Sequence, residues 1–230
     1  MVLAIAAAGC RTAGPPPAID AAMADCVPAD AATLAGINLV TVRASPLYAR
    51  IPANGRAFLE AFGPSPYLLH AYRNGEHLMV ARGTLTGWTA APHGIALNGS
   101  PDLVRDALAR HARSPLVAIA EPLAARAPLW AVLRGGTTLP LAGNLANANN
   151  LLRGVEQVTL AAQIGERVSL ELAAVCPSAD AAARYEGSLR ALVSLAEAAN
   201  KNEAVRAVRI ERTDRSVRAM LSVAPEAITP

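Results

Sequence analysis

The chain has 230 residues, of which 53% are hydrophobic and 17% are charged, so it can form a sizeable core and is not a globally disordered protein. Only 3% of the residues are aromatic, which leaves alanine, leucine and valine to build that core. The net charge of +3 is scattered along the chain as arginines rather than gathered with aromatic residues, so we expect no binding of nucleic acid.

The N-terminal residues 1–9 read MVLAIAAAG and precede Cys10. This apolar run is too short to span a bilayer, which takes about 20 residues, and it is typical of the end of a secretory signal segment. Residues 7–10 (AAGC) resemble the lipobox of bacterial lipoproteins. The resemblance implies that residues 1–9 are removed and that a lipid on Cys10 anchors the chain to a membrane. An ordinary signal segment and a plain N-terminal tail are the alternatives.

The same resemblance implies export to the cell envelope. Arg11 stands where an aspartate would favour retention at the inner membrane, so we expect the periplasmic face of the outer membrane. Residues 10–26 include the consecutive prolines Pro15, Pro16 and Pro17, which stiffen a chain into an extended form. We interpret residues 10–26 as a tether to a folded body with a first half at 27–127 and a second half at 128–225.

Two further cysteines are Cys26, before the first expected strand, and Cys176, at the end of a later one. In an exported protein they can pair, so we consider a Cys26–Cys176 disulfide beside the alternative of two separate buried thiols. No cysteine has the spacing to another cysteine or to a histidine that a zinc site requires, and we expect no metal site.

The first half opens with an expected strand at Leu34–Val40 and a helical stretch from about Ser45 to Phe62, interrupted near Pro52 and Gly55. Two strands, Tyr67–Arg73 and Glu76–Arg82, then flank Asn74-Gly75, a strong hairpin signal because both turn positions need positive φ. This turn predicts Tyr72 opposite His77 and His70 opposite Met79. The core face then carries Leu69, Ala71, Leu78 and Val80.

The first half closes with a strand at Gly94–Asn98 and two helices. Ser100-Pro101-Asp102 begins one helix, and Ser114-Pro115 begins another that runs to about Arg126. The second half opens with a strand at Leu129–Arg134, a Gly135-Gly136 link and a short helix from Asn144 to Arg153.

The strand register of the next hairpin can be predicted from the alternation of its apolar and polar residues. A three-residue loop, Gly165–Arg167, brings the apolar positions of both strands to one face. The opposite face then carries the polar residues Gln157, Thr159, Gln163, Ser169 and Glu171. We therefore expect this part of the sheet to have one dry and one wet face.

The chain closes with its longest helix and a last hairpin. Ser178 caps the helix, which runs to about Ala199. Strands at Val205–Arg212 and Val217–Val223, with the loop Thr213–Ser216, pair Ile210 with Ala219 and Val208 with Leu221. The hairpin splits the arginine series Arg206, Arg209, Arg212, Arg215 and Arg218 between two faces.

Both halves begin with a strand, a helix and a hairpin, which points to an old duplication. Because hairpins dominate, we predict an α+β fold in which an antiparallel, hairpin-rich sheet carries helices on one face.

No catalytic or cofactor motif is present, so we expect no enzyme activity and no cofactor. His70, Tyr72 and His77 share a hairpin face, where two imidazoles could reach one ion. No third ligand is adjacent in sequence, and we interpret this as a half-exposed amphipathic face.

The residues LANANNLL at 145–152 form an asparagine-rich segment. Asparagine is a poor interior helix residue because its amide competes for the backbone. The cluster could hydrogen-bond a partner or ligand, or it could be a solvated face. Its members are Asn144, Asn147, Asn149 and Asn150.

The leading hypothesis is a non-enzymatic envelope lipoprotein that acts as a binding or structural module. Its partners would be the membrane, through the lipid on Cys10, and another envelope protein or ligand. The alternative is a soluble carrier or sensor that holds a small apolar ligand between sheet and helices. An enzyme with dispersed catalytic residues ranks below both.

Overall fold

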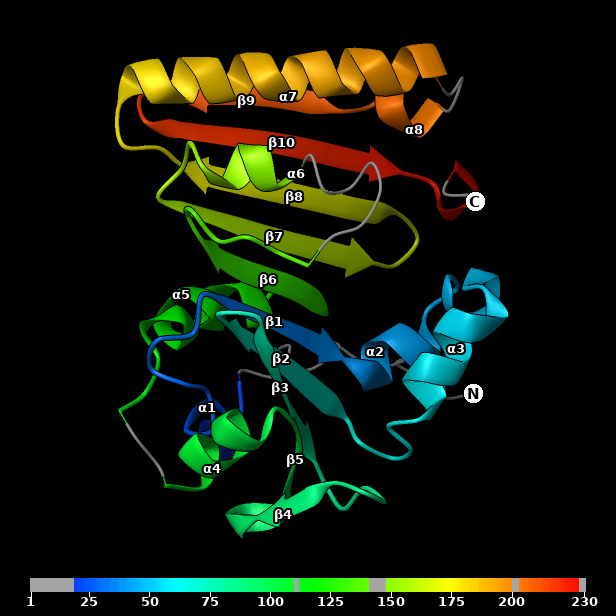
Figure 1. The fold of residues 1–230 in the computed structure, drawn as a ribbon. Coiled ribbons are helices and arrows are strands. Elements are labelled where there is room, and N and C mark those ends of the chain that lie inside the picture. Colours follow the sequence, from blue (N-terminus) through cyan, green and yellow to red (C-terminus); the bar gives the residue numbers. More distant parts are fainter. Residues whose placement is uncertain (1–18, 110–111, 141–147, 200–202, 228–230) are drawn as a thin grey trace, which may run out of the picture.

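The computed structural model describes residues 19–109, 112–140, 148–199 and 203–227. Its centre is one antiparallel sheet of ten strands in the order β4-β5-β3-β2-β1-β6-β7-β8-β10-β9 (Figure 1). The two halves of the chain therefore share a single sheet, joined where β1 pairs with β6.

The first half contributes five strands: β1 (Thr33–Asn38), β2 (Tyr67–Arg73), β3 (Glu76–Arg82), β4 (Thr89–Ala91) and β5 (Ile95–Gly99). Its helices are α1 (Ala21–Ala24), α2 (Leu39–Ala44), α3 (Ala53–Glu60), α4 (Pro101–Ala109) and α5 (Pro115–Ala124), with 3-10 turns η1 (Tyr48–Arg50) and η2 (Pro92–Gly94).

The second half contributes β6 (Leu129–Arg134), β7 (Gln157–Ile164), β8 (Val168–Val175), β9 (Arg209–Thr213) and β10 (Ser216–Val223). Its helices are α6 (Ala148–Leu152), α7 (Ala179–Ala199) and α8 (Glu203–Arg206), with the 3-10 turn η4 (Pro225–Ala227). From the junction outward, the strands of the first half lie in the order β1-β2-β3-β5-β4 and those of the second half in the order β6-β7-β8-β10-β9. In both halves, the last strand along the chain therefore lies inside the one before it. This order supports the duplication inferred from the sequence.

The hairpin registers predicted from the sequence are confirmed wherever the strands pair, including Ile210 opposite Ala219 in the last hairpin. Tyr72 pairs with His77 and His70 with Met79. The turn residues Asn74 and Gly75 have φ of 50° and 91°, as a type I′ turn requires. In the second half, Ile164 pairs with Val168 across the three-residue loop.

Helices cover both faces of the sheet, whereas we expected them on one. Face A, which carries Leu34, Leu69 and Val80, packs against α1, α4 and α5. Face B packs against α2 and α3 in the first half, through Leu68 and Ala81. In the second half, face B packs against α7 through Val158, Ala174 and Val217.

The first strand ends sooner than predicted, because Asn38 caps a helix. Its side-chain oxygen accepts a hydrogen bond from the backbone N–H of Thr41 at 3.0 Å, and Leu39 and Val40 become the first turn of α2. Pro52 stands immediately before α3, while Gly55 lies inside it rather than ending it. The short edge strand β4 was not predicted.

Of the two alternatives for Cys26 and Cys176, the structure has the two separate buried thiols. Cys26 lies in the cluster on face A, and its thiol donates to the carbonyl of Ala22 at 3.3 Å. Cys176 lies in the cluster on face B beside Tyr185, and no disulfide joins the two. The sheet separates them, and burial raises the pKa of the Cys176 thiol.

Among the described residues, no helix combines the length and the apolar character needed to cross a membrane.

Candidate functional site

No described helix covers face A of the second half beyond β6. The register of β7, β8 and β10 places on it the polar positions predicted as the wet face, so that prediction is confirmed. Gln163, Arg218 and Ser222 on this face are exposed. Helix α7 packs on the opposite face.

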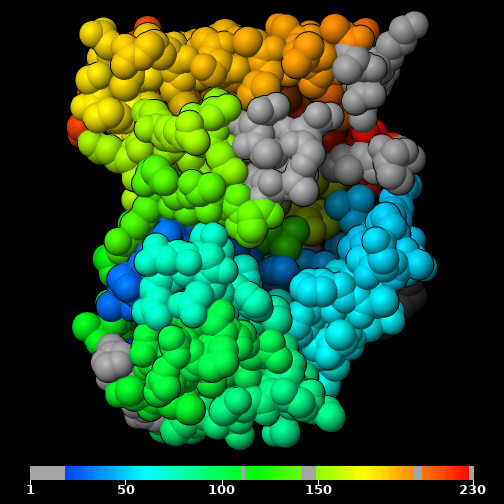
Figure 2. All heavy atoms as spheres, in the orientation of Figure 1, coloured from blue at the N-terminus to red at the C-terminus, as the bar shows by residue number. Residues whose placement is uncertain are grey.

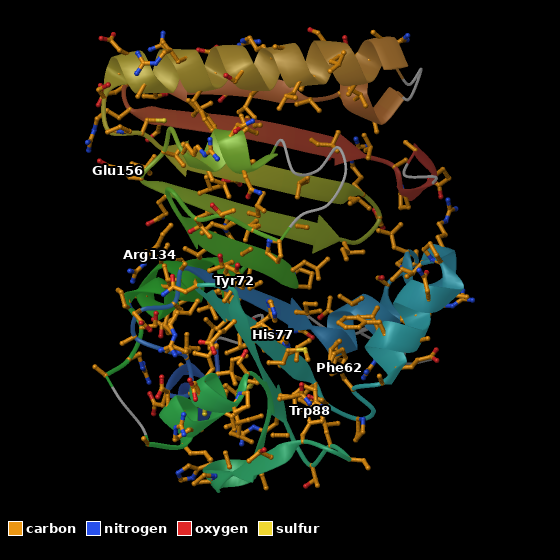
Figure 3. All side chains as sticks on the ribbon, viewed as in Figure 1. Phe62, Tyr72, His77, Trp88, Arg134 and Glu156 are labelled. Atoms are coloured by element: carbon orange, nitrogen blue, oxygen red, sulfur yellow. The ribbon has the colours of Figure 1, made fainter. Side chains whose placement is uncertain are left out.

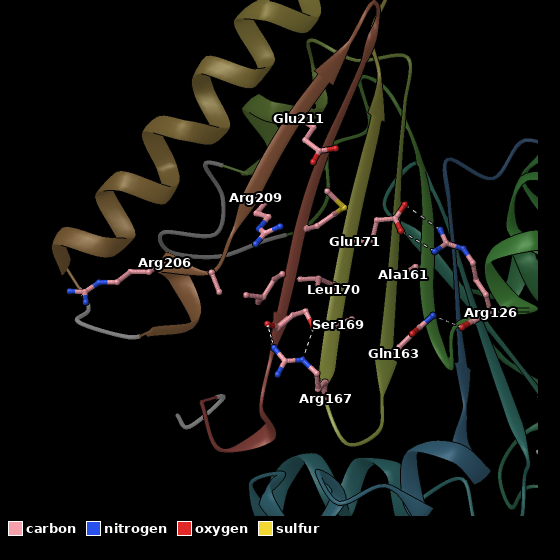
Figure 4. Close-up of a pocket in the computed structure, with 14 residues that line it drawn as sticks. Arg126, Ala161, Gln163, Arg167, Ser169, Leu170, Glu171, Arg206, Arg209 and Glu211 are labelled. Atoms are coloured by element: carbon pink, nitrogen blue, oxygen red, sulfur yellow. Dashed lines mark hydrogen bonds and ion pairs between the residues drawn. The ribbon is translucent and has the colours of Figure 1, made fainter.

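A groove of about 660 Å³ lies on this uncovered face (Figure 4). It is lined by strands β7 to β10, by α8 and by Arg126, which follows α5. Strand β9 pairs with β10 only as far as Arg209 opposite Met220, so the last residues of β10 pair with β8 but have no strand on their other side. Helix α8 takes the place where we predicted Val208 to pair with Leu221. That prediction is wrong, and the change opens this end of the groove.

Four arginines line the groove against two glutamates, so its lining carries a net positive charge. Arg126 donates to the Glu171 carboxylate at 3.0 Å, and Arg218 reaches the same carboxylate at 3.4 Å. One glutamate is thus already neutralised by two guanidinium groups. Arg206 and Arg209 are exposed and have no ion pair within the part of the chain that the structure describes.

The remaining groove arginine, Arg167, is fixed by Ser222. Its Nε donates to the Ser222 hydroxyl at 3.1 Å and its Nη2 donates to the Ser222 carbonyl at 2.7 Å. The carbonyl of Arg126 is held by Gln163, whose amide donates to it at 3.1 Å. The groove therefore combines two positioned and two uncommitted guanidinium groups, which bind carboxylate or phosphate oxygens in a planar, two-pronged manner.

Sequence reasoning missed this groove because its arginines come from distant segments. The predicted hairpin does split the arginine series: Arg212 bonds to Glu186 of α7 at 2.9 Å, on the side of face B. Arg209 and Arg218 stay on face A, where Arg126 and Arg167 join them. The polar alternation of β7 and β8 was the one local signal.

The asparagine cluster is only partly described, since Asn144 and Asn147 lie outside the described residues. Asn149 has a structural role. Its side-chain oxygen accepts from the backbone N–H of Leu139 at 2.8 Å, and its amide donates to the Leu139 carbonyl at 3.0 Å. Asn150, next to it, is exposed.

Replacing Asn149 by alanine should destabilise the fold by about 1–2 kcal/mol, because it leaves two backbone groups of Leu139 without partners. Asn150→Ala is the matched control and should change the free energy of unfolding by less than about 0.5 kcal/mol, as exposed positions do. Urea unfolding of both variants measures the difference. Equal effects of the two substitutions would refute the structural role.

The histidine pair on face B of the first half has the predicted arrangement. The rings of His70 and His77 have their centroids 6.0 Å apart, with 30° between their planes. Burial lowers the pKa of His70, and the nearby His77 lowers it further. Figure 3 shows Tyr72 and His77 on the side turned toward the viewer, between the α2–α3 segment and α6. Among the described residues, no three His, Cys, Asp or Glu side chains gather as a metal site.

A second groove, of about 470 Å³, lies at the end of β1 and is lined by Met23, Val40, Pro66 and Tyr67 with the Asp20–Arg82 ion pair. Val40 in its wall is 59% exposed. The groove is open to solvent on one side.

No known protein-family model matches this chain, and no curated protein sequence matches it. Solved structures similar to it include crystal forms of the protein TP0453. Form III superposes with a TM-score of 0.54 at 11% identity, over 89% of this chain and 95% of that one. Form I gives a TM-score of 0.48 at 10% identity, over 89% of this chain and 94% of that one. The likeness to form III shows a shared fold.

Proposed function

We propose that this protein is a non-enzymatic envelope lipoprotein that binds an acidic envelope component through the uncovered part of face A. The observation that carries the binding role is the arginine-lined groove, where Arg206 and Arg209 have no carboxylate partner among the described residues. The envelope location rests on the lipobox-like residues 7–10 and on the prolines at 15–17. The predicted end of the tether at residue 26 is wrong, because Ile19, Met23 and Cys26 are buried in the core on face A.

The arrangement of the molecule suits a tethered binding module. Helices α1, α4 and α5 cover face A in the first half, and α7 covers face B in the second. This leaves face A of the second half for a partner. Because exposed charges act through water, binding there would weaken with rising salt, with a screening length of about 8 Å at 0.15 M.

The anchor is tested by expressing the native gene, upstream region included, in a Gram-negative host beside Cys10→Ala. We expect the wild type to gain the mass of a diacylglyceryl group and to fractionate with membranes, and the variant to do neither. If both proteins stay unmodified and cytoplasmic, the lipoprotein proposal fails.

The groove is tested in the same cells with a photo-crosslinker at Ser222, which lines it, and at Ser194 on α7 as the matched exposed control. We expect a salt-sensitive adduct from position 222 that the double variant Arg206→Glu/Arg209→Glu abolishes. Adducts of equal yield from both positions, or an adduct that survives the charge reversal, would remove the groove from the proposal.

The alternative, a carrier of a small apolar ligand, is favoured by the groove at Met23, Val40 and Tyr67. A carrier encloses most of its ligand, however, and this groove is open on one side. We therefore rank it second.

A further inference from the structure

Two histidines and a methionine lie close together on face B of the first half, away from the arginine-lined groove. Residues of β2 and β3 alternate between faces, so His70, His77 and Met79 occupy the face opposite to that of Leu69 and Val80. His70 lies directly opposite Met79, and His77 is the diagonal neighbour of His70.

The separation of the two imidazoles fits a shared ion. A ring nitrogen lies about 1 Å from its ring centre and binds a metal at about 2.0–2.1 Å, so two imidazoles on one ion have centres at most about 6.3 Å apart. The observed centroid separation of His70 and His77 is 6.0 Å. Because the two rings are stacked, both side chains must turn about their χ torsions before a nitrogen of each ring points at the same ion.

Met79 supplies the third ligand that the sequence reasoning did not consider. Directly opposed residues of an antiparallel pair have Cβ atoms about 4.5–5.5 Å apart, within reach of a long side chain. Methionine is unbranched and flexible, so its thioether can turn toward the neighbouring histidine. Met79 is half-buried, which leaves it accessible from the face.

The ligand set selects the ion. Imidazole binds zinc and copper, but a thioether favours Cu(I). The described face-B positions of β1, β2, β3 and β5 in this region carry no carboxylate, so the site has no negative charge to offset a divalent ion. We propose that His70, His77 and Met79 bind a cuprous ion on face B.

The surface leaves the site open. Figure 2 shows the molecule hollowed between the α2–α3 segment and the second half, with β2 and β3 residues on the adjoining surface. Helices α2 and α3 pack farther along the same face, around Leu68 and Ala81, and Met79 packs against the edge of that cluster. An ion would therefore reach the histidines without any change in the sheet.

The test is an anaerobic titration of the full chain with Cu(I), buffered by a chromogenic chelator of known affinity. We expect one ion per chain. His77→Asn and Met79→Leu should each weaken binding by at least about 100-fold, since even changes beyond the ligands cost 10–100-fold. His93→Asn and Met220→Leu, at a surface turn and on face A, are the matched controls and should bind as the wild type does.

A second measurement uses only the wild-type chain and so does not depend on whether the variants fold. In the wild-type chain, Cu(I) should shift the NMR signals of the Met79 methyl and of both histidine rings, and leave the Met220 methyl in place. The proposal is overturned if the wild type does not compete with the chelator, if His77→Asn and Met79→Leu bind unchanged, or if only Zn(II) shifts these signals.

Discussion

Gly36→Ala should destabilise the protein by about 3–5 kcal/mol, as measured by urea unfolding. Gly36 lies in β1 directly opposite Trp130 of β6, at the junction of the two halves. A Cβ at this position would lie 2.3 Å from two carbon atoms of the indole, so the ring would have to move. Trp130 is buried and donates from Nε1 to the Tyr67 hydroxyl at 2.6 Å, and displacement of the ring breaks that bond.

The matched control for this substitution is Gly187→Ala in α7. A Cβ there meets nothing within 4 Å, and alanine is the better helix former. We expect this variant to be unchanged or more stable by up to about 1 kcal/mol. If the two variants unfolded at the same urea concentration, close packing of Trp130 on Gly36 could not be what holds the junction together.

The parts of the fold that the sequence predicts are those decided locally. A hairpin register depends on turn residues and on alternation within some 16 residues, which is why the predicted registers are right wherever the strands pair. The caps of α5 and α7 are equally local: the side chains of Ser114 and Ser178 accept from backbone N–H groups as expected.

The two-sided covering of the sheet was missed, although the sequence carries a signal for it. Strands β2 and β6 contain near-continuous apolar runs, Tyr67-Leu68-Leu69 and Leu129–Leu133, which are typical of strands buried on both faces. The first half of strand β8 alternates, as Val168-Ser169-Leu170-Glu171, and there it has one wet face. The two patterns therefore distinguish the central strands, which are buried on both faces, from the strands of the second half, which have one face open to solvent.

The start of β9 shows where local patterns fail. Val205 and Val208 suggested a strand, but residues 203–206 form α8, which buries Ala204 and contacts β10. One helical turn packed against β10 thus replaces the strand pairing expected for residues 206–208. This short helix lines the groove. Whether residues 203–206 form a helix or a strand depends on packing against distant residues, so the candidate site could not be predicted from local sequence alone.

Gly135 marks a further limit of sequence reasoning. The Gly135-Gly136 link suggests a bend that could admit a ligand. In the structure, however, a Cβ on Gly135 would lie 1.7 Å from the Val155 carbonyl oxygen, and its N–H donates to the Glu156 carbonyl at 2.8 Å. The glycine is required by a close approach of two backbones.

Stability should fall steeply above pH 10, because two buried tyrosines resist ionisation in the folded state. Burial raises the pKa of Tyr67 to about 12, although the hydrogen bond from Trp130 opposes this rise. Burial likewise raises the pKa of Tyr185 to about 12, and the neighbouring Cys176 adds to the rise. Tyr67 is 8% and Tyr185 5% exposed, so solvent screens neither effect strongly.

The direction of this effect follows from proton linkage. In the unfolded chain tyrosine loses its proton near pH 10, whereas the folded chain keeps both protons until about pH 12. The unfolded state therefore binds fewer protons between these values, and the free energy of unfolding decreases as the pH rises. The stabilisation is complete below pH 10, and its loss by pH 12 amounts to about 2–3 kcal/mol for each tyrosine.

Urea unfolding between pH 9 and 12 measures this loss, with absorbance near 295 nm to follow tyrosine ionisation. Lys201 is the only lysine in the sequence and arginine stays charged, so the other groups that titrate in this window are chiefly the remaining tyrosines and the cysteines, among them Cys176, whose pKa burial also raises. Tyr67→Phe and Tyr185→Phe should each remove about half of the slope that the two buried tyrosines contribute. Tyr67→Phe also removes the acceptor for Trp130, which lowers stability at every pH without changing the slope. A slope that survives both substitutions would show that other groups cause the alkaline loss.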